Sequence, residues 1–526
     1  MKYITWKKKA FNVTLGTLLA ATLVACTGGG TDEGDKDEAA DTLVIAHNTQ
    51  PPSLDAHVST ANATAEVMRN VWEPLVAMDM ENNPQPVLAE SVTHNEDYSQ
   101  TTFTLRDVKF HDGSDLDSKD VVDSIERWAK YSPAGAYFSN TEFETPDDKT
   151  VVMNSDHPFF SALTLLADPS QFPAIMPSET LEGIEKDGLD EFIGTGPYKF
   201  VEWQTDQHIK LQRNDEYQAP PALGDGLAGE RVATYESLLF QIVPDPNTRL
   251  SGIQVGEYDI ALSILPDNAA QIESSSDLIL DVNQAGLIGM VFNKAEGELF
   301  HDQDLRHAIQ TAIDMEAVMQ GAYSSEEFYS LDGALGMPYQ ELWYNEEGLG
   351  EYNVADQAKV DEYLDAAGYG GEEIRFMATR DYPEYYNAAI VVEQQLKDAG
   401  FNVKLEVYDW PTLLSNASDP SKYEMYMTAW TDAAVPTKYT FMSAQGNGST
   451  NDADLFGAIE SVNFADSAEN ASEAMKELQR IHYDYLPMVK LGNRMALIAV
   501  NENIDGYYYQ PGAGPIFMNA RPKSNA

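Results

Sequence analysis

The single cysteine is the residue of this chain with the most specific chemistry. Cys26 follows Leu23-Val24-Ala25 and an apolar stretch of 13 residues from Val13 to Ala25, which is preceded by four lysines within the first nine residues. A bilayer-spanning helix needs about 20 residues, so this stretch is predicted to be a secretory signal. A small residue before the cysteine is typical of a lipoprotein signal, whose cysteine carries a diacylglyceryl group. The alternative is an ordinary cleaved signal with an incidental cysteine.

The remaining polar residues show none of the usual catalytic arrangements. The sequence contains no HExxH, GxSxG or Walker motif and no free thiol nucleophile. The segment 194–198 (GTGPY) is superficially similar to a phosphate loop, but no Lys-Ser/Thr follows it and residues 198–203 are typical of a strand, so a tight turn is predicted. The nine histidines lack metal-ligand spacing, and His111 is predicted to be structural. We therefore expect no catalytic residue, no metal site and no cofactor.

The charge of the chain restricts its partners. It carries 33 basic and 85 acidic residues, a formal net charge of −52. Nucleic-acid binding needs a basic surface, so this charge argues against it. A solvated acidic surface that keeps an exported protein soluble explains the charge more simply than electrostatic capture of a substrate. The length of 526 residues predicts two or three domains, and with no second cysteine no intrachain disulfide is expected.

Apolar periodicity predicts alternating helices and strands after an acidic, flexible tether at residues 26–41. Residues 43–46 are typical of a buried strand, and Ser118 is expected to cap a helix that carries Val121, Val122, Ile125 and Trp128 on one face. Further helices are predicted at 305–312, at 353–367 with Gly368 as the terminating residue, and at 389–396, where Gly400 precedes a strand at 401–407. This alternation predicts an α/β class in more than one lobe.

Several short blocks, in order between residues 43 and 520, resemble those of the family 5 extracellular solute-binding proteins, the peptide- and nickel-binding components of ABC importers. The blocks are 71–75 (VWEPL), 86–91 (PVLAES), 103–113 (FTLRDVKFHDG), 119–122 (KDVV), 194–198 (GTGPY), 213–214 (RN), 306–309 (RHAI), 312–314 (AID) and 366–369 (AAGY). Each block alone is weak, but their order and spacing make the resemblance specific.

The resemblance implies a two-lobed α/β fold of the periplasmic-binding-protein type II class, with an extra inserted domain and a ligand cleft between the lobes. By analogy, domain I combines residues 42–75, 193–285 and 488–526, domain II is the insertion 76–192, and domain III covers 286–487. The chain would cross between lobes twice and form a hinge. The implied protein is a monomer, anchored by lipid to the outer face of the cell membrane, that delivers di- or oligopeptides to the permease and ATPase of an ABC importer.

The resemblance also suggests a partner for the ligand ammonium. In peptide-binding members, an aspartate after a buried tryptophan meets the peptide α-ammonium, because a buried charge needs an opposite charge. Asp432, in Trp430-Thr431-Asp432, is the implied equivalent. The match requires a one-residue shift, and typical members carry Asp before the proline, where this chain has Val435. The alternative is an exposed loop aspartate.

Arg380 is the sequence candidate for a ligand carboxylate, since arginine makes bidentate carboxylate contacts. Its alternative is a surface or interlobe salt bridge. Tyr382, Trp410 and Trp430 are candidates for the walls of the pocket, or else ordinary core. The run 507–509 (YYY) is predicted to pack at the surface of domain I rather than to touch ligand.

Three other functions remain open at this stage. A receptor for nickel or a nickel–metallophore has the same implied fold, and metal wrapped in a chelator needs no histidine cluster. A surface hydrolase would need a nucleophile–base pair, which the motifs do not supply. A sensor that binds peptide for signalling cannot be separated from an importer by sequence.

Overall fold

The computed structural model describes residues 41–184, 186, 188–219, 221 and 224–524. The predicted signal peptide (1–25), Cys26 and all but the last residue of the tether (26–41) lie outside the described residues. Residues 42–526 form one structural unit.

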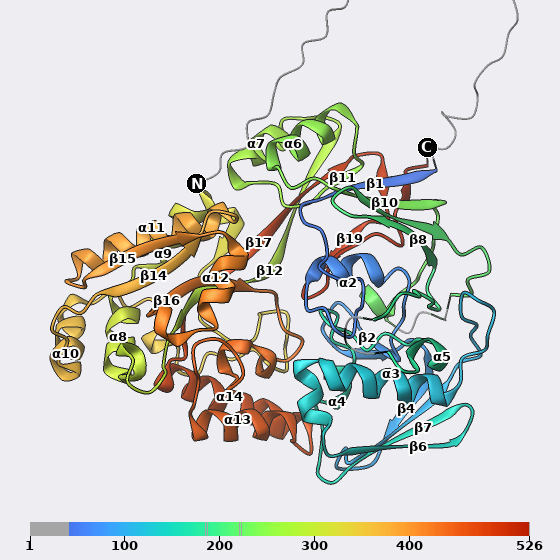
Figure 1. Cartoon of the computed structure of the whole chain (residues 1–526), viewed down its shortest axis with the longest axis horizontal. Helices are drawn as coiled ribbons and strands as arrows, with labels where there is room; N and C mark the ends of the chain where they lie inside the picture. Colours follow the sequence, from blue (N-terminus) through green and yellow to red (C-terminus); the bar gives the residue numbers. More distant parts are fainter. Residues whose placement is uncertain (1–40, 185, 187, 220, 222–223, 525–526) are drawn as a thin grey trace, which may run out of the picture. The chain divides into compact units, whose positions relative to one another are not determined.

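Two long antiparallel strands, β12 (Leu278–Phe292) and β17 (Met488–Asn501), connect the two sides of this unit. They lie in the middle of an eleven-stranded sheet, in which ten strands follow the order β15-β14-β16-β12-β17-β11-β1-β10-β9-β8 and the eleventh, β13 (Tyr329–Ser330), pairs with β17. Figure 1 shows them running between the two groups of elements. We call these the β16 side and the β1 side, after one strand on each side of the crossing pair: β16 pairs with β12, and β1 follows β11, which pairs with β17.

The β16 side contains the strands β16 (Met425–Trp430), β14 (Ile374–Thr379) and β15 (Val403–Tyr408). Helix α11 (Pro383–Asp398) packs on these strands, so the predicted unit of a helix followed by a strand is confirmed. The other helices here are α8 (Gln303–Ala312), α9 (Met315–Tyr323), α10 (Gln357–Ala367), α12 (Trp410–Ala417), α13 (Ala453–Asn463) and α14 (Ala468–Tyr485).

The β1 side contains β1 (Thr42–His47), β8 (Tyr198–Gln204), β9 (His208–Arg213), β10 (Ser237–Ile242) and β11 (Ile260–Ala261). The strands predicted at 43–46 and 198–203 are therefore confirmed. The remaining short elements of the molecule, apart from β13, are α2 (Asn62–Met68), β2 (Val76–Met78), β3 (Pro84–Pro86), α4 (Ala162–Leu166), α5 (Ser178–Leu181), α6 (Pro246–Val255), α7 (Ala269–Glu273), β18 (Ile504–Asp505), β19 (Tyr508–Gln510), β20 (Gly514–Ile516) and β21 (Arg521–Pro522).

A separate antiparallel sheet is formed by residues 89–155 and packs against α3 (Ser118–Tyr131). Its strands are, in order, β4 (Ala89–His94), β5 (Gln100–Leu105), β7 (Thr150–Ser155) and β6 (Thr141–Asp147). The predicted cap of α3 was one residue off. Asp117 has the extended backbone that a cap needs and accepts from the N–H groups of Lys119 and Asp120, whereas the Ser118 hydroxyl donates to a strand carbonyl.

The helix predicted at 353–367 begins later than expected. Asn353 and Ala355 have φ angles of +52° and +48°, which a right-handed helix cannot contain. Helix α10 starts at Gln357 with Asp356 as its cap, and it ends at Gly368 in the left-handed conformation, as predicted.

Three apolar clusters form the core. One covers the strands of the β16 side with α8, α9 and α11, and a second surrounds β1, β9 and β10. The third joins the four-stranded sheet to α13 and α14 through residues such as Phe103, Trp128, Leu455 and Leu478. The four-stranded sheet is thus bound to the β16 side by apolar burial, the main favourable term in packing. No helix within the described residues is long and apolar enough to cross a membrane.

The crossing strands require glycine at position 286. Gly286 has φ +134°, and a Cβ there would lie 1.8 Å from the carbonyl oxygen of Trp430 on the neighbouring strand. We expect Gly286→Ala to lower the free energy of unfolding by more than about 2 kcal/mol, since both the backbone and a strand contact must shift. Urea unfolding measures this change.

Gly256→Ala is the matched control. Gly256 also has positive φ (+77°), but a Cβ there would meet nothing within 4 Å, so only backbone strain of about 1 kcal/mol is expected. Equal losses in the two variants would contradict the close contact between β12 and β16.

Candidate functional site

Asp432 is buried just beyond the end of β16. Its residue is 1% exposed, so the alternative of an exposed loop aspartate is excluded. Its carboxylate accepts from Gln284 Nε2 at 3.3 Å and from the Tyr339 hydroxyl at 3.4 Å. Burial raises the pKa of Asp432 to about 6. Asp432 forms no ion pair with any residue that the structure describes. A carboxylate held in this way favours a cation that comes from outside the protein.

The loop that carries Asp432 is fixed from both sides. Gln340 Nε2 donates to the Ala433 carbonyl at 2.8 Å, and Asn82 Nδ2 donates to the Ala434 carbonyl at 2.9 Å. Lys438 forms a buried ion pair with Asp168 at 2.7 Å. Burial alone would raise the pKa of Asp168, but the Lys438 ammonium holds it below its usual value. Asn82 and Asp168 lie before β8 in the chain, whereas Gln340 and Lys438 lie after β12. Residues from both of these segments therefore position the loop.

Arg494 lies at the middle of β17 and is not among the site residues predicted from the sequence. Its backbone is the register partner of Gly286 on β12, and its side chain is half-buried. Its Nε has no hydrogen-bond partner, and the guanidinium forms no hydrogen bond or ion pair with any residue in the described ranges. Its electrostatic neighbours include Tyr385, Tyr509 and Asp432.

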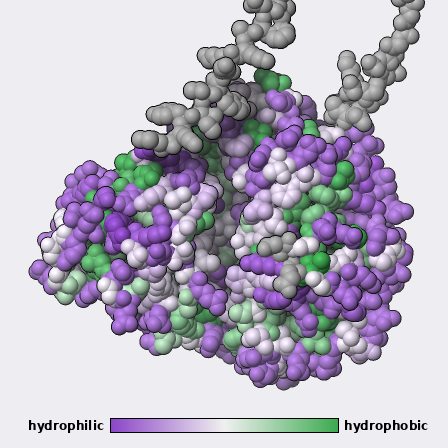
Figure 2. Space-filling model, viewed as in Figure 1, coloured by the Kyte–Doolittle hydropathy of each residue, from purple (hydrophilic) through white to green (hydrophobic). Residues whose placement is uncertain are grey.

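These residues make up the central polar cluster: Gln284, Tyr339, Tyr385, Asp432, Arg494 and Tyr509. They come from β12, β17, α11, β19 and the loops that follow β13 and β16. Figure 2 shows that the surface is hollowed between the two sides of the molecule, in the view of Figure 1. The cluster therefore joins segments far apart in sequence at the strands that cross between the two sides.

Tyr382 and Trp410, two of the three aromatic residues predicted to line the pocket, lie together next to this cluster. Tyr382, Tyr385 and Trp410 form a ring group, with centroids 4.9 Å apart for Tyr382–Tyr385 and 5.4 Å for Tyr382–Trp410. Such pairs add to the free energy of burial. Trp430 lies elsewhere: its ring packs edge-on against Phe441, and its Nε1 donates to the Thr440 hydroxyl at 3.1 Å.

Arg380 is not joined to the cluster. It is exposed after the end of β14, with its guanidinium 4.7 Å from the ring centroid of Tyr386 and Nη2 donating to the Tyr386 hydroxyl at 2.8 Å. The partner is a tyrosine and not the acidic residue of a salt bridge, and contact of Arg380 with a ligand carboxylate stays a prediction.

The tyrosine run 507–509 packs against the apolar cluster that surrounds β1, β9 and β10. The hydroxyl of Tyr508 donates to the Gly226 carbonyl on the β1 side, in keeping with the predicted packing there. Tyr509 is also an electrostatic neighbour of Arg494 and Asp432, and burial raises its pKa. The predicted packing of the run on domain I is therefore in keeping with the structure, and β19 places Tyr509 near the crossing strands as well.

His111 holds the turn at 194–198, as a structural histidine would. Its Nε2 lies 2.9 Å from the Gly196 carbonyl, and its Nδ1 accepts from the Gly194 N–H at 3.2 Å. Burial lowers the pKa of His111 to about 4, so the ring is neutral. Within the described residues, no three His, Cys, Asp or Glu side chains are grouped to hold a metal ion.

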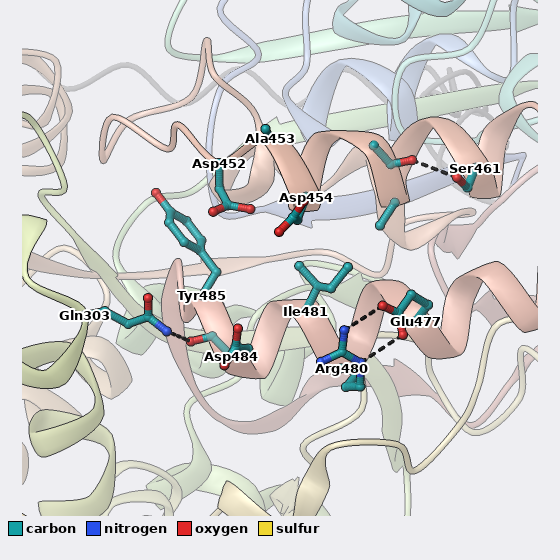
Figure 3. Close-up of a pocket in the computed structure, with 12 residues that line it drawn as sticks. Gln303, Asp452, Ala453, Asp454, Ser461, Glu477, Arg480, Ile481, Asp484 and Tyr485 are labelled. Atoms are coloured by element: carbon teal, nitrogen blue, oxygen red, sulfur yellow. Dashed lines mark hydrogen bonds and ion pairs between the residues drawn. The ribbon is translucent and has the colours of Figure 1, made fainter.

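A second concavity lies on the outer surface between α13 and α14 and encloses about 580 Å³. Figure 3 shows its acidic lining, including Asp452, Asp454 and Asp484, and the pair between Arg480 and Glu477. Its polar groups are solvated or paired with each other. It lacks the unpaired charges of the central polar cluster, so it is the weaker candidate for a ligand-binding site.

A sequence model of the bacterial extracellular solute-binding proteins, family 5, matches residues 83–452. The chain belongs to this family. It is 25% identical over 490 residues to a probable peptide ABC transporter periplasmic-binding protein of Sinorhizobium fredii, covering 89% of this chain and 90% of that protein.

Solved structures show the same fold. The oligopeptide-binding protein AppA of Bacillus subtilis, in complex with a nonapeptide, has a TM-score of 0.76 at 20% identity, covering 92% of this chain and 99% of AppA. NikZ of Campylobacter jejuni, in complex with Ni(L-His), has a TM-score of 0.75 at 19% identity, covering 91% of this chain and 98% of NikZ. The predicted two-lobed fold of the periplasmic-binding-protein type II class is confirmed.

Proposed function

We propose that this solute-binding protein captures peptides between its two sides and delivers them to the permease and ATPase of an ABC importer. The observation that carries this proposal is Asp432, a buried carboxylate at the crossing strands that forms no ion pair with the residues that the structure describes. A peptide α-ammonium would supply the missing charge. The peptide-binding relatives of the family support the same ligand class.

The domain division expected from the sequence stays a proposal that the strand order supports. Domain I would be 42–75, 193–285 and 488–526, domain II 76–192 and domain III 286–487. The boundary at 285–286 falls at a register shift in β12, and the boundary at 488 is the first residue of β17. Bending at these strands would open and close the site, so ligand binding would be coupled to closure.

The location is also part of the proposal. Cys26 would carry the lipid after removal of residues 1–25, and residues 26–41 would tether the protein to the outer face of the cell membrane. Two or more acyl chains give stable anchoring. The receptor would work as a monomer, without nucleic acid and without a cofactor.

The nickel-chelate receptor is the alternative ligand class, because NikZ has the same fold. Titration with a mixture of di- to pentapeptides, and separately with nickel plus histidine, tests both. We expect peptides alone to raise the melting temperature, since a ligand at 100 times its dissociation constant adds about 2.7 kcal/mol. Stabilisation by nickel plus histidine alone would reject the peptide proposal. Peptide cleavage, followed by mass spectrometry in the same samples, would indicate a hydrolase instead.

Peptide binding should weaken in acid because Asp432 must be ionised to attract the ammonium. Its pKa of about 6 in the free protein lies above that of an ordinary aspartate. The dissociation constant should therefore rise as pH falls below about 6, by up to about tenfold per unit, while the peptide carboxylate stays ionised until about pH 4. Calorimetry between pH 5 and 7.5 measures this.

Asp432→Asn is the control for this pH dependence. It should bind weakly at every pH and lose the dependence between pH 5 and 7. The nearby Asp168→Asn is a comparison with a carboxylate that already has a cation, Lys438, and it should keep the wild-type pH dependence. An unchanged slope in Asp432→Asn would assign the dependence to another group.

Cys26→Ala should release the protein from the membrane without changing its affinity for peptide. Fractionation of expressing cells and calorimetry on the released protein measure the two effects separately. Retention of the variant in the membrane fraction would contradict the lipid anchor. A loss of affinity would contradict the separation of anchor from receptor.

A further inference from the structure

We infer that Arg494 binds the carboxylate of the ligand and that, with Asp432, it restricts the ligand to short zwitterions whose opposite charges are one or two residues apart. This inference rests on the proposed peptide-binding function. It assigns to a strand residue the role that sequence reasoning gave to Arg380.

The first argument is the lack of partners around the Arg494 guanidinium. Other enclosed arginines of this chain are paired: Arg231 with Glu73 at 3.0 Å, and Arg306 with backbone carbonyls of residues 300, 301, 485 and 486. Arg494 has no hydrogen bond or ion pair in the part of the chain that the structure describes, and its Nε is buried. A guanidinium has five donors in a planar fork that fits a carboxylate.

The second argument is that the surroundings of Arg494 leave another donor free. Tyr323 is buried, and its hydroxyl has no partner among the described residues. It is an electrostatic neighbour of Arg494, together with Tyr385, Tyr509 and Glu384. Glu384 forms no ion pair with the guanidinium; burial raises the pKa of Glu384, and the charge of Arg494 opposes this shift. An unpaired guanidinium and an unpaired hydroxyl at one place together suit an incoming carboxylate.

The third argument is the distance across the sheet. Leu287 pairs with Trp430 on β16, and Gly286 pairs with Arg494 on β17. Neighbouring strands lie about 4.8 Å apart, so the backbones of β16 and β17 are separated by about 10 Å. Asp432 follows Trp430 by two residues, and the two charged side chains influence each other electrostatically. They therefore lie near each other at the crossing strands, although they do not pair.

This distance limits the ligand. An extended peptide advances about 3.3–3.6 Å per residue, so one or two residues bring an ammonium to Asp432 and a carboxylate to Arg494. The termini of a nine-residue peptide lie about 30 Å apart when extended. Such a peptide could not contact both groups with its two ends. Charge recognition at both ends would thus select for length independently of side chains.

Arg380 is the competing candidate, and its position argues against it. Its guanidinium already lies over the ring of Tyr386 and donates to its hydroxyl. A carboxylate there would be solvated and screened, which reduces the free energy of binding.

The test compares ligands before it compares variants. Wild-type full-length protein is titrated calorimetrically with a defined mixture of dipeptides, with the same dipeptides as C-terminal amides, and with nonapeptides. We expect the free acids to bind about ten- to hundredfold more tightly than the amides, because the amides leave Arg494 unpaired. The nonapeptides should bind more weakly than the free dipeptides. This comparison of ligands uses only the wild-type protein, so it does not depend on the folding of any variant.

The variants then assign the preference to one residue. Arg494→Met should bind acid and amide dipeptides equally, and Arg494→Lys should retain part of the difference because it keeps the charge but loses the fork. Arg480→Met, at an exposed arginine paired with Glu477 on α14, is the matched control and should behave as wild type.

Three outcomes would overturn the inference. Equal binding of acids and amides by wild type would remove the carboxylate contact, while leaving peptide binding itself in place. Loss of the preference in Arg380→Met but not in Arg494→Met would assign the contact to Arg380. Tighter binding of nonapeptides than of dipeptides would reject the length limit. Failure of every peptide to bind would instead reject the proposed function on which the inference rests.

Discussion

The pairing of β12 with β17 is the constraint on which the rest of the structure depends. These strands carry the chain between the two sides, and β16 and β11 attach to their outer edges. Backbone hydrogen bonds along both strands must be satisfied, so the register of the pair is fixed. Register shifts at Gln284/Gly286 and Ile288/Gly289 bend the ladder at its centre. β-Bulges strengthen local twist and redirect side chains, and here they coincide with the positions of Gln284 and Arg494.

The central polar cluster has an energetic cost that packing elsewhere must offset. An enclosed charge without a partner is expensive, and replacing one by a well-packed apolar residue is often stabilising. Asp432 and Arg494 interact electrostatically without forming an ion pair, so neither is fully compensated by the other. Other buried charges of this chain form ion pairs, such as Arg127 with Asp55 and Lys438 with Asp168. Groups left unpaired against this pattern indicate a site prepared for something that binds.

The sequence predicted local elements well because their causes are local. The strand at 43–46, the helix–strand unit ending in β15 and the left-handed Gly368 follow from periodicity and cap chemistry over a few residues. The errors were also local: Asp117 rather than Ser118 caps α3, and positive φ at Asn353 delays α10. Asp432 was found by resemblance to a family, and its burial became visible only in the structure.

Arg494 shows why the candidate site could not be predicted completely. Its role depends on pairing with Gly286, which lies more than two hundred residues earlier in the chain, and no local pattern encodes this register. A weak signal was present: Lys490 and Arg494 are the two charged residues of a mostly apolar strand, in a chain with a net charge of −52. In such a chain most of the surface repels anions, so a ligand carboxylate needs a specific cation to enter. Lys490 already donates to the Ala334 carbonyl, while Arg494 remains unpaired. The acidic surface therefore increases the importance of Arg494. The rest of the surface repels a ligand that carries a negative charge, so binding of such a ligand depends on this guanidinium.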